Sequence, residues 1–266
     1  MLFIQTLKWH LIALFQEIKI PFKEAFKINL IGNFYGLITP SKLGSVIRAE
    51  YFKKHTNNNN IGKGLFNFTI DKILDITSII FIVILFSFLF KNIIDLPINF
   101  FIALFLSFFL VTIFFIKKDR SKFVLRFFYK KIINKNVKDK ARATFDSFYE
   151  DVPKKRYFIL FFILNLISWI FIYLIYYFIG LSLGIELSFL YYLAIMPVAT
   201  LVSMIPVSIN GIGTREATLI SLFALFNVDS AKVFSMSILD YLIVGIIPSI
   251  ITLFIIWKDN YKNTFQ

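Results

Sequence analysis

The chain has 266 residues, of which 58% are hydrophobic and only 17% are charged, and its formal net charge is +13. A soluble domain of this length would be closer to half apolar, so the composition excludes an ordinary soluble protein and predicts an integral membrane protein. The apolar segments are continuous and lack the alternation of a barrel strand. We therefore predict an all-α, polytopic fold in which residues 1–266 form a single membrane domain.

The first unusual segment in chain order is residues 28–41, which are uncharged but too few to cross the hydrocarbon core of a bilayer as a helix. The segment breaks at Pro40 and Gly44 and continues as SVIRAEYFKKH, which carries Arg48. We predict a re-entrant helical hairpin, which enters the bilayer and returns to the same side. Non-helical backbone at that depth is tolerated only where it is buried in protein or lines a wet cavity.

Four segments are predicted to cross the membrane completely. They are residues 76–90 extended backwards through Asp75 and Asp71, residues 96–116, residues 157–185, and residues 241–257, which begin just after Asp240. A helix of roughly 20 apolar residues crosses a hydrocarbon core of about 30 Å. An aromatic belt at the outer membrane surface is predicted from Trp169, Tyr173, Tyr176 and Tyr177.

Between Lys117 and Arg156 lies the only long polar segment, with 14 Lys or Arg residues and 5 Asp or Glu residues. By the positive-inside rule, this loop (117–156) and the C-terminus are predicted to be cytoplasmic, in a multi-pass protein of the plasma membrane. Apolar residues at helical spacing suggest that the loop also binds the anionic inner leaflet, namely Phe123, Phe127, Phe128 and Ile132. The simpler interpretation is a topology signal and a solvated linker. Nucleic-acid binding is not predicted, because the positive-inside rule already explains the excess of positive charge in this loop.

A second broken region follows the third span. Residues 187–214 are uncharged but are interrupted by PVSINGIGTRE, which runs from Pro206 to Glu216. Residues 217–228 then supply only a short apolar segment, so neither half is a good independent crossing. We predict a second re-entrant hairpin, with Arg215 at the start of its outgoing helix.

The two broken regions resemble each other. The first reads TPSKLGSVIRAE and is followed by IDKILDI, and the second reads IPVSINGIGTRE and is followed by SMSILDY. Arg48 precedes Asp75 by 27 residues, and Arg215 precedes Asp240 by 25. We interpret this order of features as an internal structural repeat.

The distribution of basic residues gives the two repeats opposite orientations. The first unit (about 20–117) begins and ends on the cytoplasmic side, and the second (about 157–258) has its hairpin facing outwards. Inverted repeats with broken helices that meet near the midplane are typical of transporters.

Arg48 and Arg215 are the predicted substrate contacts, since guanidinium is a donor fork suited to phosphate and a helix N-terminus adds positive dipole. The whole predicted binding set is Arg215, Arg48, Gly213, Gly211, Ser208, Gly44 and Lys42. The predicted charge partners are Glu216, Asp240 and Asp75, because buried charges need partners. Two alternatives stay open. In the first, the two arginines contact no substrate and only hold the broken helices together. In the second, Asp75 and Asp240 carry protons that couple transport to a gradient.

Catalytic motifs are absent from the sequence. It contains no HExxH, GxSxG, Walker A or CxxC pattern, no cysteine, and only two histidines, so no metal or other cofactor is predicted. We predict a transporter without catalytic activity. Other functions stay open: an anchor or accessory subunit of a lipid-modifying or glycosyl-transferring enzyme, bound through the basic loop, and a proton-coupled small-solute transporter. A homo-oligomer is compatible with each of them.

At these motifs the chain resembles the flippase-like family named after the membrane region of lysylphosphatidylglycerol synthase. The first motif, NFYGLITPSKLGSVIR, matches the family pattern at Asn33, Pro40, Gly44 and Arg48. It departs from that pattern at Ser41, Lys42 and Ser45, which replace Gly, Arg and Glu. The second motif, PVSINGIGTRE, matches at Pro206, Ser208, Gly211, Gly213, Arg215 and Glu216.

The resemblance implies movement between leaflets of an anionic or aminoacylated phospholipid, or of a polyprenyl-linked lipid. In two-domain relatives the aminoacyl-transferring activity resides in a separate soluble domain, so synthase activity is not expected from these residues. Relatives also have further apolar sequence before the first motif, so one or two N-terminal helices are expected to be missing or reduced.

Overall fold

The computed structural model describes residues 1–40, 42–56, 60–93, 97–116, 118, 120 and 135–264. All regular secondary structure in these ranges is helical, which confirms the predicted all-α class. Three continuous helical stretches are long and apolar enough to cross a membrane, namely residues 62–89, 155–182 and 230–257. Each has 28 residues, and a helix of that length extends for about 42 Å, more than a hydrocarbon core requires.

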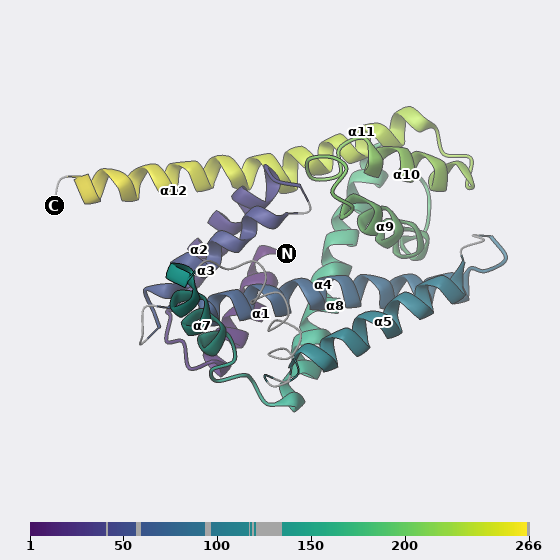
Figure 1. The fold of residues 1–266 in the computed structure, drawn as a ribbon. Helices are drawn as coiled ribbons and strands as arrows, with labels where there is room; N and C mark the ends of the chain where they lie inside the picture. Colours follow the sequence, from purple (N-terminus) through teal and green to yellow (C-terminus); the bar gives the residue numbers. More distant parts are fainter. Residues whose placement is uncertain are drawn as a thin grey trace.

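The helices follow the predicted order of spans and breaks. They are α1 (Leu2–Phe15), α2 (Phe22–Leu37), the 3₁₀ turn η1 (Leu43–Val46), α3 (Ile47–Lys53), α4 (Gly62–Leu89), α5 (Ile98–Ile116), α7 (Lys135–Phe148), α8 (Lys155–Ser182), α9 (Phe189–Ser203), α10 (Thr214–Ala224), α11 (Ser230–Asp240), the π-helical segment η2 (Tyr241–Ile246) and α12 (Ile247–Thr264) (Figure 1). The predicted spans at 96–116 and 157–185 correspond to α5 and α8 with slightly shifted ends.

Helix α4 lies at the centre of the fold and packs against α9, α5, α3, α7 and α8 (Figure 1). Its second half is an apolar run without Gly or Pro, and its inward-facing residues, such as Ile79 and Ile80, are fully buried. Its first half instead buries polar side chains, among them Asn67 and Asp71. A charge buried in a membrane protein needs a partner, so the first half of α4 determines where cations must lie.

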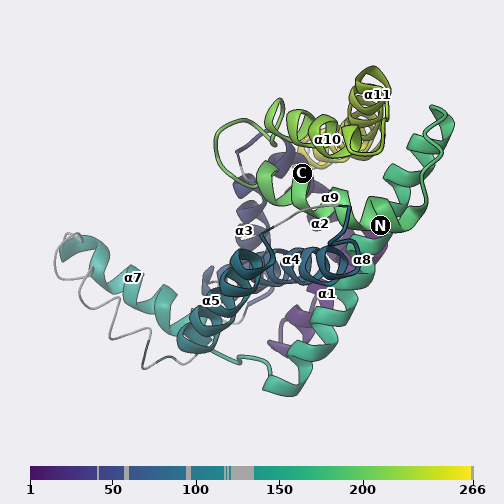
Figure 2. The same cartoon turned by 90° about the vertical axis from the view of Figure 1, so that its right-hand side faces the viewer.

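The largest apolar core lies where α8, α9, α10 and α11 meet, and Figure 2 shows α10 and α11 above α9. Tyr173 and Tyr192 are completely buried in this core, and Trp169 and Tyr176 are almost so. The predicted aromatic belt is therefore wrong for Trp169, Tyr173 and Tyr176. Because α8 packs against both α9 and α11, this face of α8 points into the protein.

The first predicted break interrupts the helical backbone between α2 and η1. Helix α2 ends at Leu37, and Pro40 follows, whose ring fixes φ and removes the N–H that a helix would need. Lys42 then adopts a left-handed conformation with φ +56° and precedes η1 and α3. The chain thereby turns sharply and brings α3 against α4.

The second predicted break lies between α9 and α10. Left-handed φ values of +51° at Asn210, +75° at Gly211 and +88° at Gly213 turn the chain. At the start of α10 the Gly213 N–H donates to Glu216 Oε2 at 2.5 Å, which is the half of a capping box that a glycine N-cap can form. The two breaks contact each other, because Pro40 and Ile209 form an isolated antiparallel bridge. The inverted, re-entrant arrangement of these regions stays a prediction.

The last predicted span starts earlier than the sequence suggested. Helix α11 begins at Ser230 because Asp229 caps it, accepting hydrogen bonds from the backbone N–H groups of Ala231 at 2.8 Å and Lys232 at 3.3 Å. It continues without interruption through η2 into α12. The π-helical segment starts directly after Asp240, and such segments occur frequently at functional sites.

The basic loop is described only in part. The apolar residues predicted to contact the leaflet, Phe123, Phe127, Phe128 and Ile132, lie outside the described residues. The last part of the loop forms α7, which packs against the start of α4. There the rings of Phe148 and Phe66 lie 5.2 Å apart, and Lys63 forms an ion pair with Asp151.

Candidate functional site

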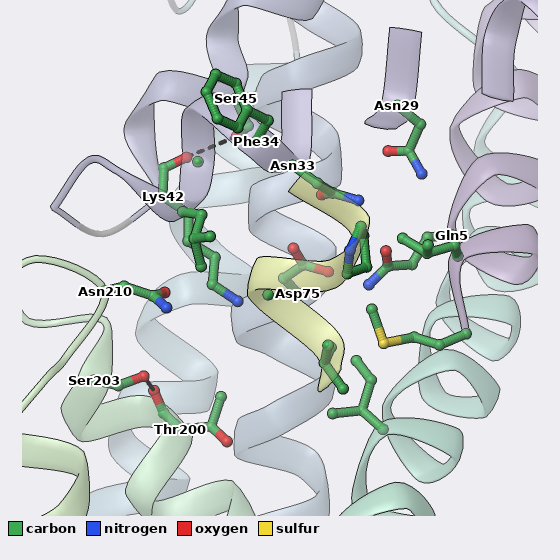
Figure 3. A pocket seen from close by; sticks show the side chains of 18 of the residues that line it. Gln5, Asn29, Asn33, Phe34, Lys42, Ser45, Asp75, Thr200, Ser203 and Asn210 are labelled. Carbon is green, nitrogen blue, oxygen red and sulfur yellow. Dashed lines mark hydrogen bonds between the residues drawn. The ribbon is translucent and has the colours of Figure 1, made fainter. Parts of the chain in front are cut away.

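A cavity of about 320 Å³ is bordered by both helical breaks (Figure 3). Residues of α1, α2, η1, α3, α4, α8, α9, α10, α11, η2 and α12 contribute to its lining. Five basic and three acidic residues are among them, namely Lys8, Lys42, Arg48, Lys72, Arg215, Asp71, Asp75 and Asp240. Charges inside a membrane protein mark either substrate pathways or internal ion pairs, so the partner of each side chain decides its role.

Asp71 is the centre of the first charge cluster. Its carboxylate lies 2.6 Å from Lys8 Nζ and 2.8 Å from Arg48 Nη2, and the three side chains are only 3–9% exposed. Asp75, one helical turn further along α4, pairs with Lys8 at 3.2 Å and with Lys72 at 3.8 Å. Arg48 thus pairs with Asp71 and not with Asp75 as predicted, because α3 lies beside the earlier turn of α4.

Buried amides extend this cluster to five helices. Asn29 of α2 accepts a hydrogen bond from Arg48 Nη1 at 3.3 Å and donates to Thr6 Oγ1 at 2.9 Å. Asn165 of α8 accepts from Lys8 Nζ at 2.5 Å and donates to Ser78 Oγ at 3.0 Å. Lys8 and both amides are not among the residues predicted from the sequence. A single Lys within the apolar helix α1 was the available signal, since such a cation requires a buried acid.

Arg215 is the centre of the second charge cluster. Its guanidinium donates to Glu216 Oε1 at 2.9 and 3.1 Å and to the Tyr176 hydroxyl at 3.2 Å. It also donates to the Ser237 carbonyl at 3.3 Å and lies 3.7 Å from Asp240 Oδ2. The predicted partners Glu216 and Asp240 are therefore both beside Arg215. Glu216 also accepts from Ser237 Oγ at 2.6 Å, which fixes α10 to α11.

Four of the predicted binding residues do not line the cavity and shape the breaks instead, namely Gly44, Ser208, Gly211 and Gly213. A Cβ at Gly211 would collide with Ser203, and one at Gly44 would collide with the Tyr35 carbonyl. Gly213 has open space around it, but its φ of +88° is one that L side chains rarely adopt. The Ser208 hydroxyl is buried without a hydrogen-bond partner. These residues position the backbone on which the cavity side chains stand.

Lys42 has a different environment from the other cavity cations. Its side chain is exposed and extends into the cavity from the first break, facing Asn210 of the second break (Figure 3). Within the described part of the chain it forms no ion pair, and its ammonium donates no hydrogen bond. Among the described residues there is also no group of three or more His, Asp or Glu side chains arranged to hold a metal ion.

The chain matches a known membrane-protein family over almost its whole length. The family model described as the lysylphosphatidylglycerol synthase TM region matches residues 1–252. The chain belongs to this family. A curated relative, the UPF0104 membrane protein PH1989 of Pyrococcus horikoshii, is 25% identical over 278 residues, which cover 97% of this chain and 83% of the relative. No solved structure is significantly similar to the chain.

Membership in the lysylphosphatidylglycerol synthase TM-region family confirms the resemblance on which the two motifs were recognised. In this member of the family, the arginines of both motifs are held by acidic side chains of the same chain. Lys42, which belongs to the first motif and precedes both motif arginines, forms no ion pair within the described residues.

Proposed function

We propose that this protein moves a lipid with an anionic or aminoacylated phosphate headgroup, or a polyprenyl-linked lipid, between the two leaflets of the membrane. The observation that carries this proposal is a polar, charged cavity bordered by two broken helical regions within a set of long apolar helices. Broken helices and intramembrane charges are expensive, and they are retained where they form a substrate pathway.

The size of the cavity favours a headgroup over a whole lipid. Small-molecule sites commonly occupy about 300–1,000 Å³, and this cavity lies at the lower end of that range. A polar headgroup would therefore enter the cavity while its acyl chains stay in the bilayer. We propose no catalytic step for this chain, and we propose that the basic loop and α7 lie on the anionic inner leaflet.

The proposed topology places the basic loop and the C-terminus in the cytoplasm, and the connector between α8 and α9 outside. The chain has no cysteine, so single cysteines report accessibility without a background. We expect Lys140→Cys to react with a membrane-impermeant maleimide only in inverted vesicles, and the equally exposed Glu186→Cys only in intact cells. The opposite labelling pattern would show that the protein has the reverse orientation in the membrane. Labelling of both sites from one side would contradict the proposed repeat.

Lipid translocation is tested by filling the cavity. Val244 lines the cavity from η2, whereas Leu242 lies on the same segment outside the lining and is 41% exposed. In liposomes that contain fluorescent phosphatidylglycerol, we expect Val244→Trp to reduce dithionite-accessible lipid movement to the rate of protein-free liposomes. The matched variant Leu242→Trp should retain wild-type movement. Equal rates for wild-type protein and protein-free liposomes would refute lipid translocation for these lipids.

A further inference from the structure

Among the described residues, one basic side chain of the cavity forms no ion pair within 4.0 Å. Lys8 and Arg48 share Asp71, Lys72 lies beside Asp75, and Arg215 is held by Glu216 and Asp240; these pairs are all at 3.8 Å or less. Lys42 forms no such pair within the described residues. A cation that reaches a cavity without a carboxylate in ion-pairing distance can attract an anion, because its charge is not already compensated at short range.

The backbone at Lys42 is fixed in a conformation that few residues with a side chain adopt. Its φ is +56°, and the turn is closed by the Lys42 N–H donating to the Thr39 carbonyl at 3.3 Å. The Lys42 carbonyl accepts from Ser45 Oγ at 2.7 Å. Pro40, two residues earlier, is held against Ile209 of the second break. The Lys42 side chain therefore extends into the cavity from a backbone that these hydrogen bonds hold in place.

A second unsatisfied donor lies in the same cavity. Asn33 Nδ2 of α2 is buried, has no hydrogen-bond partner, and belongs to a residue that lines the cavity. A buried donor without an acceptor costs free energy, which a bound oxygen atom would recover. Figure 3 shows Asn33 and Lys42 in the upper part of the view, with Asp75 drawn between them and Asn210 from the second break below Lys42.

We propose that Lys42, assisted by the Asn33 amide, binds the phosphate of the transported headgroup, and that Arg48 and Arg215 are positioning residues that do not contact it. This inference rests on the proposed function and names the specificity-determining residue of the same site. A Lys ammonium binds phosphate as a point charge, with three donors that rotate freely. The arginines hold α3 to α4 and α10 to the Asp240 turn, so they set the shape of the cavity.

Binding can be measured apart from transport with the purified full-length chain in detergent. Dioctanoyl phosphatidylglycerol serves as the anionic lipid probe, dioctanoyl phosphatidylcholine as the net-neutral lipid, and inorganic phosphate as the free anion. Trp169 lines the cavity and provides a fluorescence signal. We expect Lys42→Gln to weaken phosphatidylglycerol binding by roughly tenfold to a hundredfold, the range for a hydrogen bond to a charged group. Lys42→Arg should restore most of the affinity.

The matched control is Lys53→Gln, which removes the same charge from the last turn of α3, where Lys53 pairs with Glu50 away from the cavity. This variant should bind like the wild type. Because Lys42 forms no ion pair within the described residues, Lys42→Gln should nearly keep the thermal stability of the ligand-free protein, and this measurement separates lost binding from unfolding.

The outcomes separate the site from the transport function. Lys42-dependent binding of phosphatidylglycerol but not of inorganic phosphate supports a lipid phosphate site. Lys42-dependent binding of inorganic phosphate alone overturns the lipid headgroup as the ligand. Unchanged phosphatidylglycerol affinity in Lys42→Gln overturns the inference altogether. If binding depends on Lys42 while the wild-type protein moves lipid no faster than protein-free liposomes, the anion site stands and the translocase proposal fails.

Discussion

Replacing Asp71 with asparagine should lower the free energy of unfolding by about 3–5 kcal/mol, the usual cost of removing one partner from a buried ion pair. Asp71 holds Lys8 and Arg48 at once, and all three side chains are buried. The substitution keeps the size of the side chain but leaves two cations without full compensation. Denaturant titration of the purified protein in detergent, followed by tryptophan fluorescence, measures the change.

The control for this experiment is an acidic residue in an exposed pair. Glu50 lies 3.3 Å from Lys53, and its side chain is 54% exposed. Exposed pairs contribute only about 0–1 kcal/mol, so Glu50→Gln should leave the unfolding curve nearly unchanged. A second variant, Lys8→Met combined with Asp71→Asn, should lose less than the sum of the two single losses. Equal effects of Asp71→Asn and Glu50→Gln would show that the buried cluster does not hold the helices together.

Joining the two breaks with a disulfide should stop lipid movement. Pro40 and Ile209 are paired in an antiparallel bridge, in which the Cα atoms lie about 4.5–5.5 Å apart. A disulfide accepts about 4.4–6.8 Å, so the double variant Pro40→Cys and Ile209→Cys should cross-link under mild oxidation. A headgroup that passes between the breaks requires them to separate. In the liposome assay, the oxidised protein should be inactive, and a reducing agent should restore its activity.

Each single cysteine variant, treated with the same oxidant, is the control for this result. Both should remain active, since neither can form the intramolecular bond in a chain without native cysteine. Cross-linking is followed by reaction of the remaining thiols with a maleimide that shifts mobility on a gel. Full activity in the oxidised double variant would exclude a pathway that opens between Pro40 and Ile209. It would leave the binding role of Lys42 to be judged from its own titration.

Local sequence features correctly predicted where long apolar helices form and where the helical backbone breaks. Hydropathy predicted α5 and α8, because the length of an apolar run reflects the thickness of the bilayer. Pro40 and the glycines of PVSINGIGTRE predicted the breaks, since proline and positive φ interrupt a helix whatever surrounds it. The family could likewise be recognised from two short motifs, because these motifs are properties of the chain itself.

Only the tertiary structure decided which charges meet and which face of a helix is covered. Asp71 and Asp75 stand one turn apart on α4, so the sequence could not say which of them Arg48 reaches; the packing of α3 selects Asp71. Lys8 and Asn165 lie far from the motifs in sequence, and they join the cluster only because α1, α4 and α8 are neighbours. The pairing of Lys42 was decided in the same way. Within the described residues it forms no ion pair, whereas Arg48 reaches Asp71 of α4 and Arg215 lies beside Glu216 of its own helix and Asp240 of α11, because only the folded chain brings these helices together.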